Sequence, residues 1–171
     1  MSEIVNRVAN SPIVTIDLEQ YYKQGIDRVL FDVKAYLFQE LVLREKEFRK
    51  ALKEHDWEQY RGKFVAIDCT ADAIVPTWAY MLVMTYLEGT AEDVVVGTKD
   101  DLERYLFQKA LDELRPEEFE GKPVVIKGCS KFPVPVFAYG EVVRLLKAKA
   151  KTIMYGEPCS TVPVYKQPKK K

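Results

Sequence analysis

The second part of the chain alternates between short apolar runs and longer amphipathic stretches. Four runs have the length of a buried strand, and they occupy residues 63–69, 93–97, 123–128 and 151–156. The intervening segments have helical spacing of apolar residues, beginning near Val75, Thr98 and Pro135. Thr98 is expected to cap its helix together with Asp101, three residues further on. This order of elements predicts an α/β fold.

Continuous apolar strands separated by helices are typical of a parallel sheet with helices on both of its faces. We therefore predict a four-stranded parallel sheet. Its preferred strand order is 2-1-3-4, in which the strands around Ile67, Ile126 and Ile153 are neighbours and the strand around Val95 lies at the edge.

The first 60 residues have a different pattern. Two strands are expected at residues 12–18 and 28–33, paired as a β-hairpin, and a helix is expected at residues 43–60. Within this helix, Phe48, Leu52 and His55 share one face, so the single histidine of the chain is predicted to point inward.

The chain is predicted to form one domain, since no linker and no repeat of fixed period is recognised. The length of 171 residues is ordinary for a single domain with a core of its own. Residues 1–60 are expected to form an extension, residues 61–165 the α/β core, and residues 166–171 a basic tail.

The charge balance argues against nucleic acid as a partner. Lys and Arg number 26, as do Asp and Glu, so the formal net charge is zero, whereas binding phosphates needs a basic surface. The longest uncharged run, residues 73–87, has 15 residues and is too short to cross a bilayer, which needs about 20. No secretory leader is recognised, so we expect a cytoplasmic protein that does not bind membranes and whose thiols stay reduced.

All three cysteines follow predicted strands. Cys69 and Cys129 come directly after the runs that end near residues 68 and 128, and Cys159 follows the run that ends at residue 156 by three positions. Each cysteine is followed by Ser or Thr. Ligands of parallel α/β sheets bind beyond the carboxyl ends of the strands. We therefore expect the three thiols to share one site.

Three thiolates at one point favour zinc or an iron–sulfur centre. His55 is the only histidine that can complete a Cys3His set, and the carboxylates of Asp72 and Glu157 are alternative fourth ligands. In a zinc site the sulfur atoms would lie about 4 Å apart. No Cys-x-x-Cys pair is present, so the prediction depends on topology and not on a motif.

Two other functions stay open from the residues alone. Cys129 or Cys69 could be the nucleophile of an enzyme or sulfur carrier, because each precedes a helix whose N-terminus stabilises a thiolate. The chain lacks the sequence motifs of phosphatases, serine hydrolases and nucleotide-binding proteins, so nothing names a substrate. In the second alternative, a structural or interaction module, the cysteines are inert.

Several strings resemble an uncharacterised bacterial family, found mainly in Bacteroidetes and catalogued as domain of unknown function 2480. The resemblance runs from Glu3 to about Lys166, and the strings that carry it are EIVNRVANSP, LREKEFR, EHDWEQY, CTADAIVPTWAYM, VIKGCSKFPVP and YGEPCSTVPVYK. The family brings no established activity. The resemblance implies protein partners in iron–sulfur assembly, which agrees with a thiol site that handles metal or sulfur.

Overall fold

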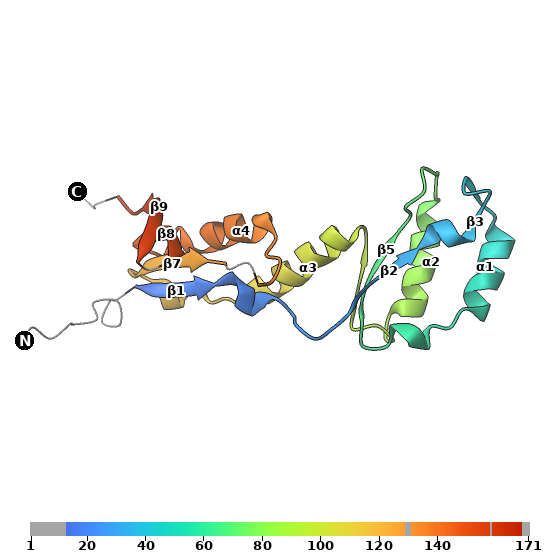
Figure 1. The fold of residues 1–171 in the computed structure, drawn as a ribbon, viewed down its shortest axis with the longest axis horizontal. Coiled ribbons are helices and arrows are strands. Elements are labelled where there is room, and N and C mark those ends of the chain that lie inside the picture. Colours follow the sequence, from blue (N-terminus) through green and yellow to red (C-terminus); the bar gives the residue numbers. More distant parts are fainter. Residues whose placement is uncertain (1–12, 129–130, 158, 169–171) are drawn as a thin grey trace, which may run out of the picture. The chain divides into compact units, whose positions relative to one another are not determined.

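The computed structural model describes residues 13–128, 131–157 and 159–168. The chain divides into two compact units. Figure 1 shows the elements of both units, coloured along the sequence from the N-terminus to the C-terminus. Unit 1 is made of Met1–Lys23 and Leu106–Lys171, and unit 2 is Gln24–Tyr105. The division does not follow the predicted boundary near residue 60.

Unit 2 contains a three-stranded parallel sheet. Its strands are β2 (Arg28–Asp32), β5 (Phe64–Asp68) and β6 (Asp93–Val96), in the order β2-β5-β6. The other elements of this unit are the helices α1 (Glu45–Glu54) and α2 (Thr77–Leu87), the short antiparallel pair β3 (Leu37–Phe38) and β4 (Val42–Leu43), and the 3-10 helices η2 (Val33–Tyr36) and η3 (Glu58–Tyr60).

Unit 1 contains a four-stranded mixed sheet. Its strands are β1 (Val14–Asp17), β7 (Pro123–Lys127), β8 (Thr152–Glu157) and β9 (Ser160–Lys166), in the order β1-β7-β8-β9. The first three are parallel, and β9 runs antiparallel to β8. Helix α4 (Val136–Leu146) and the 3-10 helices η1 (Leu18–Tyr21) and η4 (Pro116–Phe119) belong to this unit, while α3 (Lys99–Leu111) crosses the boundary between the units.

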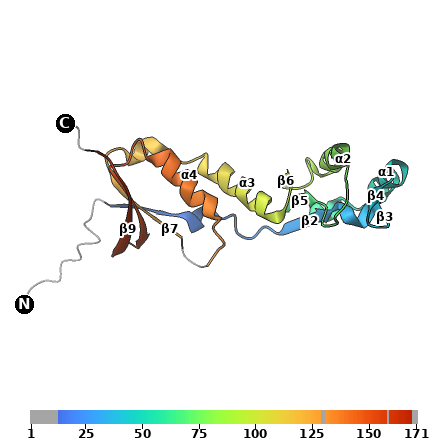
Figure 2. The same cartoon turned by 90° about the horizontal axis from the view of Figure 1, so that it is seen from above.

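Two helices of each unit pack on the same face of its sheet. In unit 2, Phe48 of α1 and Val83 of α2 share a buried cluster with Val65 and Ile67 of β5. Residues two apart on a strand point to the same face, so both helices cover that face. Unit 1 has the same arrangement, with Phe107 of α3 and Val142 of α4 against Val124 and Ile126 of β7 (Figure 2). The opposite face of the unit 2 sheet is also covered, since Phe64 and Ala66 of β5 are buried and Glu103 of α3 lies 2.5 Å from Arg28 of β2. Helices on both faces of a sheet therefore stay a prediction.

The two units repeat each other. Residues 48–97 and 107–156, which are 59 positions apart, are identical at 18 of 50 positions. The strand registers agree at the same offset: Val65 pairs with Val94 in β5 and β6, and Val124 pairs with Ile153 in β7 and β8. The prediction that the chain has no internal repeat is wrong.

The repeat extends to the hydrogen bonds of the loops. Glu92 N donates to Lys63 O at 2.9 Å, and Lys151 N donates to Lys122 O at 2.9 Å. Gly62 and Gly121, which precede these lysines, have φ of 66° and 69°, a left-handed conformation that glycine adopts without steric cost. Thus the equivalent segments share their backbone geometry as well as their sequence.

The first strand of each unit repeats at a different offset. β1 and β2 are 15 residues apart, and each is followed by a 3-10 helix whose N-cap is an aspartate, Asp17 or Asp32. Asp17 Oδ1 accepts from Glu19 N at 3.1 Å, and Asp32 Oδ1 accepts from Lys34 N at 2.9 Å. The first strands of both units therefore precede all the other strands in the sequence.

The predicted four-stranded parallel sheet is not formed. Ile126 and Ile153 do lie on neighbouring strands, but Ile67 belongs to the separate sheet of unit 2, next to the strand around Val95. The predicted hairpin is also wrong, because β1 pairs in parallel with β7 and β2 pairs in parallel with β5. Apolar patterning located the strands, but it carries no information on which strands pair.

The individual elements agree better with the predictions. Strands and helices occur in each of the predicted segments after residue 63. Asp101 Oδ2 accepts from Thr98 N at 2.9 Å, and Thr98 Oγ1 accepts from Asp101 N at 3.2 Å, which confirms the predicted cap of α3. Among the described residues, no helix is long and apolar enough to cross a membrane.

Candidate functional site

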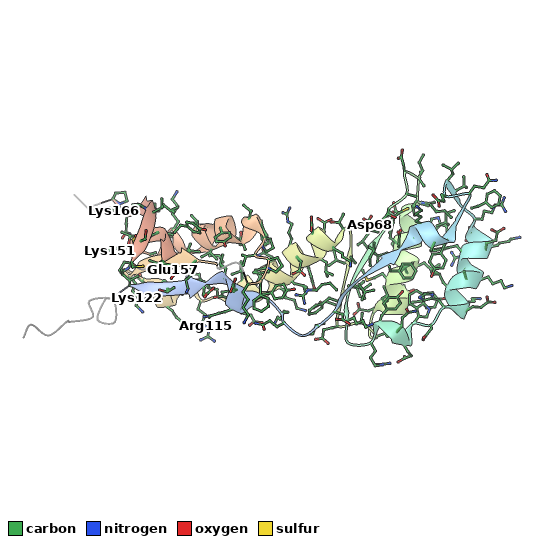
Figure 3. The ribbon with its side chains drawn as sticks, viewed as in Figure 1. Asp68, Arg115, Lys122, Lys151, Glu157 and Lys166 are labelled. Atoms are coloured by element: carbon green, nitrogen blue, oxygen red, sulfur yellow. The ribbon has the colours of Figure 1, made fainter. Side chains whose placement is uncertain are left out.

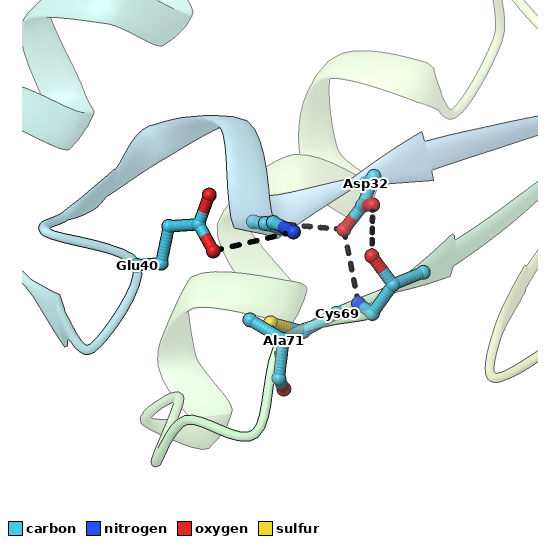
Figure 4. Close-up of polar contacts among 6 residues, drawn as sticks. Asp32, Glu40, Cys69 and Ala71 are labelled. Atoms are coloured by element: carbon cyan, nitrogen blue, oxygen red, sulfur yellow. Dashed lines mark hydrogen bonds and ion pairs between the residues drawn. The ribbon is translucent and has the colours of Figure 1, made fainter.

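Cys69 lies at the carboxyl end of β5, in a loop that is anchored by two aspartates. Its N–H donates to Oδ1 of Asp68 at 2.8 Å, and its half-buried thiol donates to the carbonyl of Ala71 at 3.7 Å. The next residue, Thr70, donates from N at 3.1 Å and from Oγ1 at 2.5 Å to the carboxylate of Asp32 (Figure 4). The loop is therefore fixed to the neighbouring strand β2.

The electrostatics of this strand end are set by Asp32. Burial alone would raise the pKa of the Asp32 carboxyl, but the hydrogen bonds from Thr70 and Lys34 and the charge of Lys34 together lower it. Lys34 also pairs with Glu40, with Nζ 3.3 Å from Oε2. Asp32 is thus held as a carboxylate beside the cysteine loop.

Tyr80 of α2 faces the same strand end. Burial raises the pKa of its phenol, and Cys69, Asp68 and Asp32 act on it in the same direction. Unit 2 therefore gathers a thiol, two carboxylates and a phenol at the carboxyl ends of β2 and β5. The sequence prediction included Cys69 but missed Asp32 and Tyr80. Asp32 and Tyr80 could have been found by comparing the two units, because Asp17 and Tyr139 are the equivalent residues of unit 1.

The equivalent strand end of unit 1 has a different set of charges. Nζ of Lys127 lies 3.5 Å from Oδ2 of Asp17 and 3.6 Å from Oε2 of Glu157. Oε1 of Glu19 accepts from the backbone N–H groups of Lys131 at 2.9 Å and of Phe132 at 3.2 Å. Three neighbouring elements are thus tied together where β1, β7 and β8 end.

The predicted metal ligands differ in their exposure and in their contacts. Cys129 lies outside the described residues, and Cys159 is an exposed free thiol in the turn between β8 and β9. Asp72 is exposed, and Glu157 is exposed and paired with Lys127. Within the part of the chain that the structure describes, no three His, Cys, Asp or Glu side chains are grouped so that they could hold a metal ion.

His55 lies at the C-terminus of α1, in an aromatic cluster of unit 2. Its Nδ1 is 3.0 Å from the hydroxyl of Tyr36, and its Nε2 is 3.1 Å from the hydroxyl of Tyr60. The ring also contacts Phe31 edge-on, with 5.6 Å between centroids, and Trp57, with 4.7 Å. Since both ring nitrogens are hydrogen-bonded, His55 would have to give up one of these bonds to bind a metal.

Burial in this cluster lowers the pKa of His55, and the charge of Asp56 only partly opposes the effect. The pKa of Tyr60 is raised to about 12, first by burial and then by the charges of Tyr36 and Asp56. The cluster therefore favours neutral forms of its titratable groups. This environment is that of a core histidine with satisfied hydrogen bonds.

The fold defines a duplicated α/β protein in which a cysteine follows β5 of unit 2 by one residue and β7 of unit 1 by two residues in the sequence. A family described as "Protein of unknown function (DUF2480)" matches residues 2–167, so the chain belongs to this family. Comparison with curated proteins and with solved structures gives no match.

Proposed function

We propose that the protein binds a soft metal ion, as zinc or within an iron–sulfur centre, through thiolates drawn from Cys69, Cys129 and Cys159. Thiolates are preferred ligands of both. The observation that carries the proposal is the internal repeat. Cys69 and Cys129 follow the equivalent strands β5 and β7 in the sequence, although they are one position out of register: Cys69 corresponds to Gly128, and Thr70 corresponds to Cys129.

The strand order of unit 1 supports the participation of Cys159. Cys129 follows the end of β7 by two residues, and Cys159 follows the end of β8 by two residues. β7 and β8 are parallel neighbours, and such strands lie about 4.8 Å apart, so their carboxyl ends share one edge of the sheet. Cys159 is exposed and belongs to no disulfide.

The fourth ligand is expected to be a carboxylate. His55 is bonded at both ring nitrogens, as described above, whereas the exposed Asp72 is three residues from Cys69 and the exposed Glu157 is two residues from Cys159. Oxygen ligands are common in zinc sites. Protein partners in iron–sulfur assembly fit the proposal, since such partners exchange metal or sulfur through thiols.

A nucleophilic cysteine has less support. Such a thiol needs a neighbouring base or cation. The charged groups that act on Tyr80 together with Cys69 are the carboxylates of Asp68 and Asp32. A bound cation would be stabilised by these negative charges.

The test is the metal content of protein purified without oxygen. We expect about one metal ion or one cluster per chain, with an ultraviolet–visible spectrum that distinguishes zinc from an iron–sulfur centre. Each of the substitutions Cys69→Ser, Cys129→Ser and Cys159→Ser should reduce the bound metal strongly, because each removes a ligand.

Thr70→Ala is the matched control, since it alters the same loop and leaves all three thiols in place. Metal-free protein after reconstitution with zinc and with iron and sulfide would refute the proposal. Retention of full metal content in one of the serine variants would remove that cysteine from the site. A single essential cysteine in an assay of sulfur transfer, without bound metal, would establish the alternative function.

A further inference from the structure

Unit 1 carries a cluster of cations where its parallel strands begin. We call this cluster the basic edge, and its members are Arg115, Lys122, Lys147, Lys149, Lys151 and Lys166. Backbone hydrogen bonds hold the segments together: Lys151 N donates to Lys122 O at 2.9 Å, and Gln167 N donates to Lys151 O at 2.9 Å. Figure 3 shows Lys122, Lys151 and Lys166 at the same end of unit 1.

The cations of the basic edge have no carboxylate partner among the described residues. The ion pairs of the described chain involve none of the six. Nζ of Lys147 lies 5.9 Å from the ring centroid of Tyr165, which is a weak contact. Three exposed glutamates, Glu117, Glu118 and Glu120, are on or next to η4 but make no ion pair with the edge.

Three of the six basic-edge positions have the opposite charge in unit 2. At the offset of 59 residues, Arg115 corresponds to Asp56, Lys147 to Glu88 and Lys151 to Glu92. These three acidic residues are exposed, and we call them the acidic edge. Of the other three positions, Lys122 corresponds to Lys63, Lys149 corresponds to Thr90, and Lys166 lies outside the repeated segment.

The opposite charges extend over the whole units. Unit 1 has 15 Lys and Arg and 10 Asp and Glu, whereas unit 2 has 11 and 16, so their formal charges are +5 and −5. The zero net charge of the chain therefore conceals two strongly charged units.

The fold itself does not require these charges. Equivalent backbone positions accept Glu in one unit and Lys in the other, and both edges are exposed. Crowding like charges on one edge destabilises a unit through repulsion, so a conserved architecture with two opposite edges indicates a role in binding.

We propose that the basic edge of one molecule binds the acidic edge of a second copy of this chain. The partner is chosen by charge complementarity, since the acidic edge presents three carboxylates in the same backbone arrangement and is present at the same concentration. Nucleic acid is a poorer partner, because the unit of charge −5 would repel its phosphates. A contact between two different surfaces is heterologous and leads to rings or chains of copies.

The first test is the dependence of mass on salt. The full-length protein, reduced and treated with chelator so that metal plays no part, is measured by sedimentation velocity. We expect association beyond the 19.8 kDa monomer at 50 mM NaCl. The association should weaken roughly tenfold or more at 500 mM NaCl, since exposed charge pairs are screened. A monomer at both salt concentrations and about 100 μM protein overturns the proposal.

The second test exchanges the charges. Lys147→Glu/Lys151→Glu makes both edges acidic, and Glu88→Lys/Glu92→Lys makes both edges basic; each new residue is the one that the other unit carries at that position. Neither variant should associate alone, and an equal mixture should associate again. Lys46→Glu/Lys50→Glu, which changes exposed lysines of α1 that lie ten and six residues before Asp56, is the control for overall charge and should behave as the unaltered protein.

Failure of the mixture to associate, while the control still does, overturns the proposal, because the edges would then not be complementary. So does salt-sensitive binding of a nucleic-acid duplex that Lys147→Glu/Lys151→Glu abolishes, since the basic edge would then serve phosphates. Because all measurements use metal-free protein, these outcomes are independent of the proposed metal site.

Discussion

The hydroxyl of Tyr36 lies 3.0 Å from Nδ1 of His55, and this contact joins η2 to the end of α1. The opposite ring nitrogen is bonded to the hydroxyl of Tyr60 at 3.1 Å. Each phenol can accept or donate, so the neutral imidazole satisfies both bonds with one N–H and one lone pair. Among the groups of this cluster, His55 is the one that titrates near neutral pH.

The lowered pKa of His55 predicts a loss of stability in mild acid. The unfolded chain takes up a proton at the ordinary histidine pKa of about 6.5, and the folded chain takes it up only at lower pH. The free energy of unfolding should therefore fall as the pH drops below about 6.5 and level off once the folded state is protonated as well. Urea denaturation between pH 5 and pH 8 measures this dependence.

His55→Leu is the matching variant, because leucine is the equivalent residue of unit 1, at position 114. It should be less stable by about 1–3 kcal/mol, since the buried Tyr60 hydroxyl loses a partner. It should also lose the change of stability between pH 5 and pH 7. A variant that keeps this pH dependence would show that another group causes it.

Gly128 and Tyr139 provide a second prediction. A Cβ added at Gly128 would lie 2.2 Å from the hydroxyl oxygen of Tyr139 and 3.2 Å from Cζ, so Gly128→Ala requires the tyrosine to move. Overpacking of this kind destabilises by about 1–3 kcal/mol. Tyr139→Phe removes the clashing oxygen, so the double variant should recover part of the loss, and urea denaturation of the four proteins gives the coupling energy. Purely additive losses would contradict the predicted contact.

The elements could be predicted from the sequence, but their pairing could not. Val65 and Ile67 alternate with other apolar residues as a buried strand requires, and this pattern located β5 correctly. One neighbour of β5 is β2, whose residues Val29 and Phe31 pair with β5 although they are more than 30 positions away in the sequence. In unit 1 the corresponding separation exceeds 100 positions, since Val14 pairs with Val124. Local patterning does not report contacts at such distances.

The repeat is hard to recognise in the sequence because its parts recur at two different offsets. The first strands recur after 15 residues and the remaining elements after 59, so no single period describes the chain. Cys69 and Cys129, which follow equivalent strands, are one position out of register between the units. Asp32 and Tyr80, which lie beside Cys69, become visible as candidates only when the units are compared.

The bonds between Thr70 and Asp32 predict a different acid response. Because the folded pKa of Asp32 is lowered, its contribution to stability is present above the unfolded pKa of about 4 and is lost as the pH falls below it. Thr70→Val removes the hydroxyl donor at 2.5 Å and keeps the backbone donor at 3.1 Å. We expect a loss of about 0.5–1.5 kcal/mol at pH 7 that shrinks toward pH 3. Equal losses at both pH values would argue against a charge-assisted bond.

Leu87 of α2 and Leu146 of α4 test whether the chain behaves as the single domain that we predict. Both side chains are fully buried, at equivalent positions in the cores of unit 2 and unit 1. Leu87→Ala and Leu146→Ala should each cost about 2–5 kcal/mol, because a buried leucine leaves a cavity when it is truncated. Hydrogen exchange followed by mass spectrometry shows where the loss is felt. In a single cooperative domain, each variant speeds exchange of the most protected amides in β5 and in β7 alike, since global unfolding exposes both. If Leu87→Ala affects only β5 and Leu146→Ala only β7, the units unfold separately and the single-domain prediction is wrong.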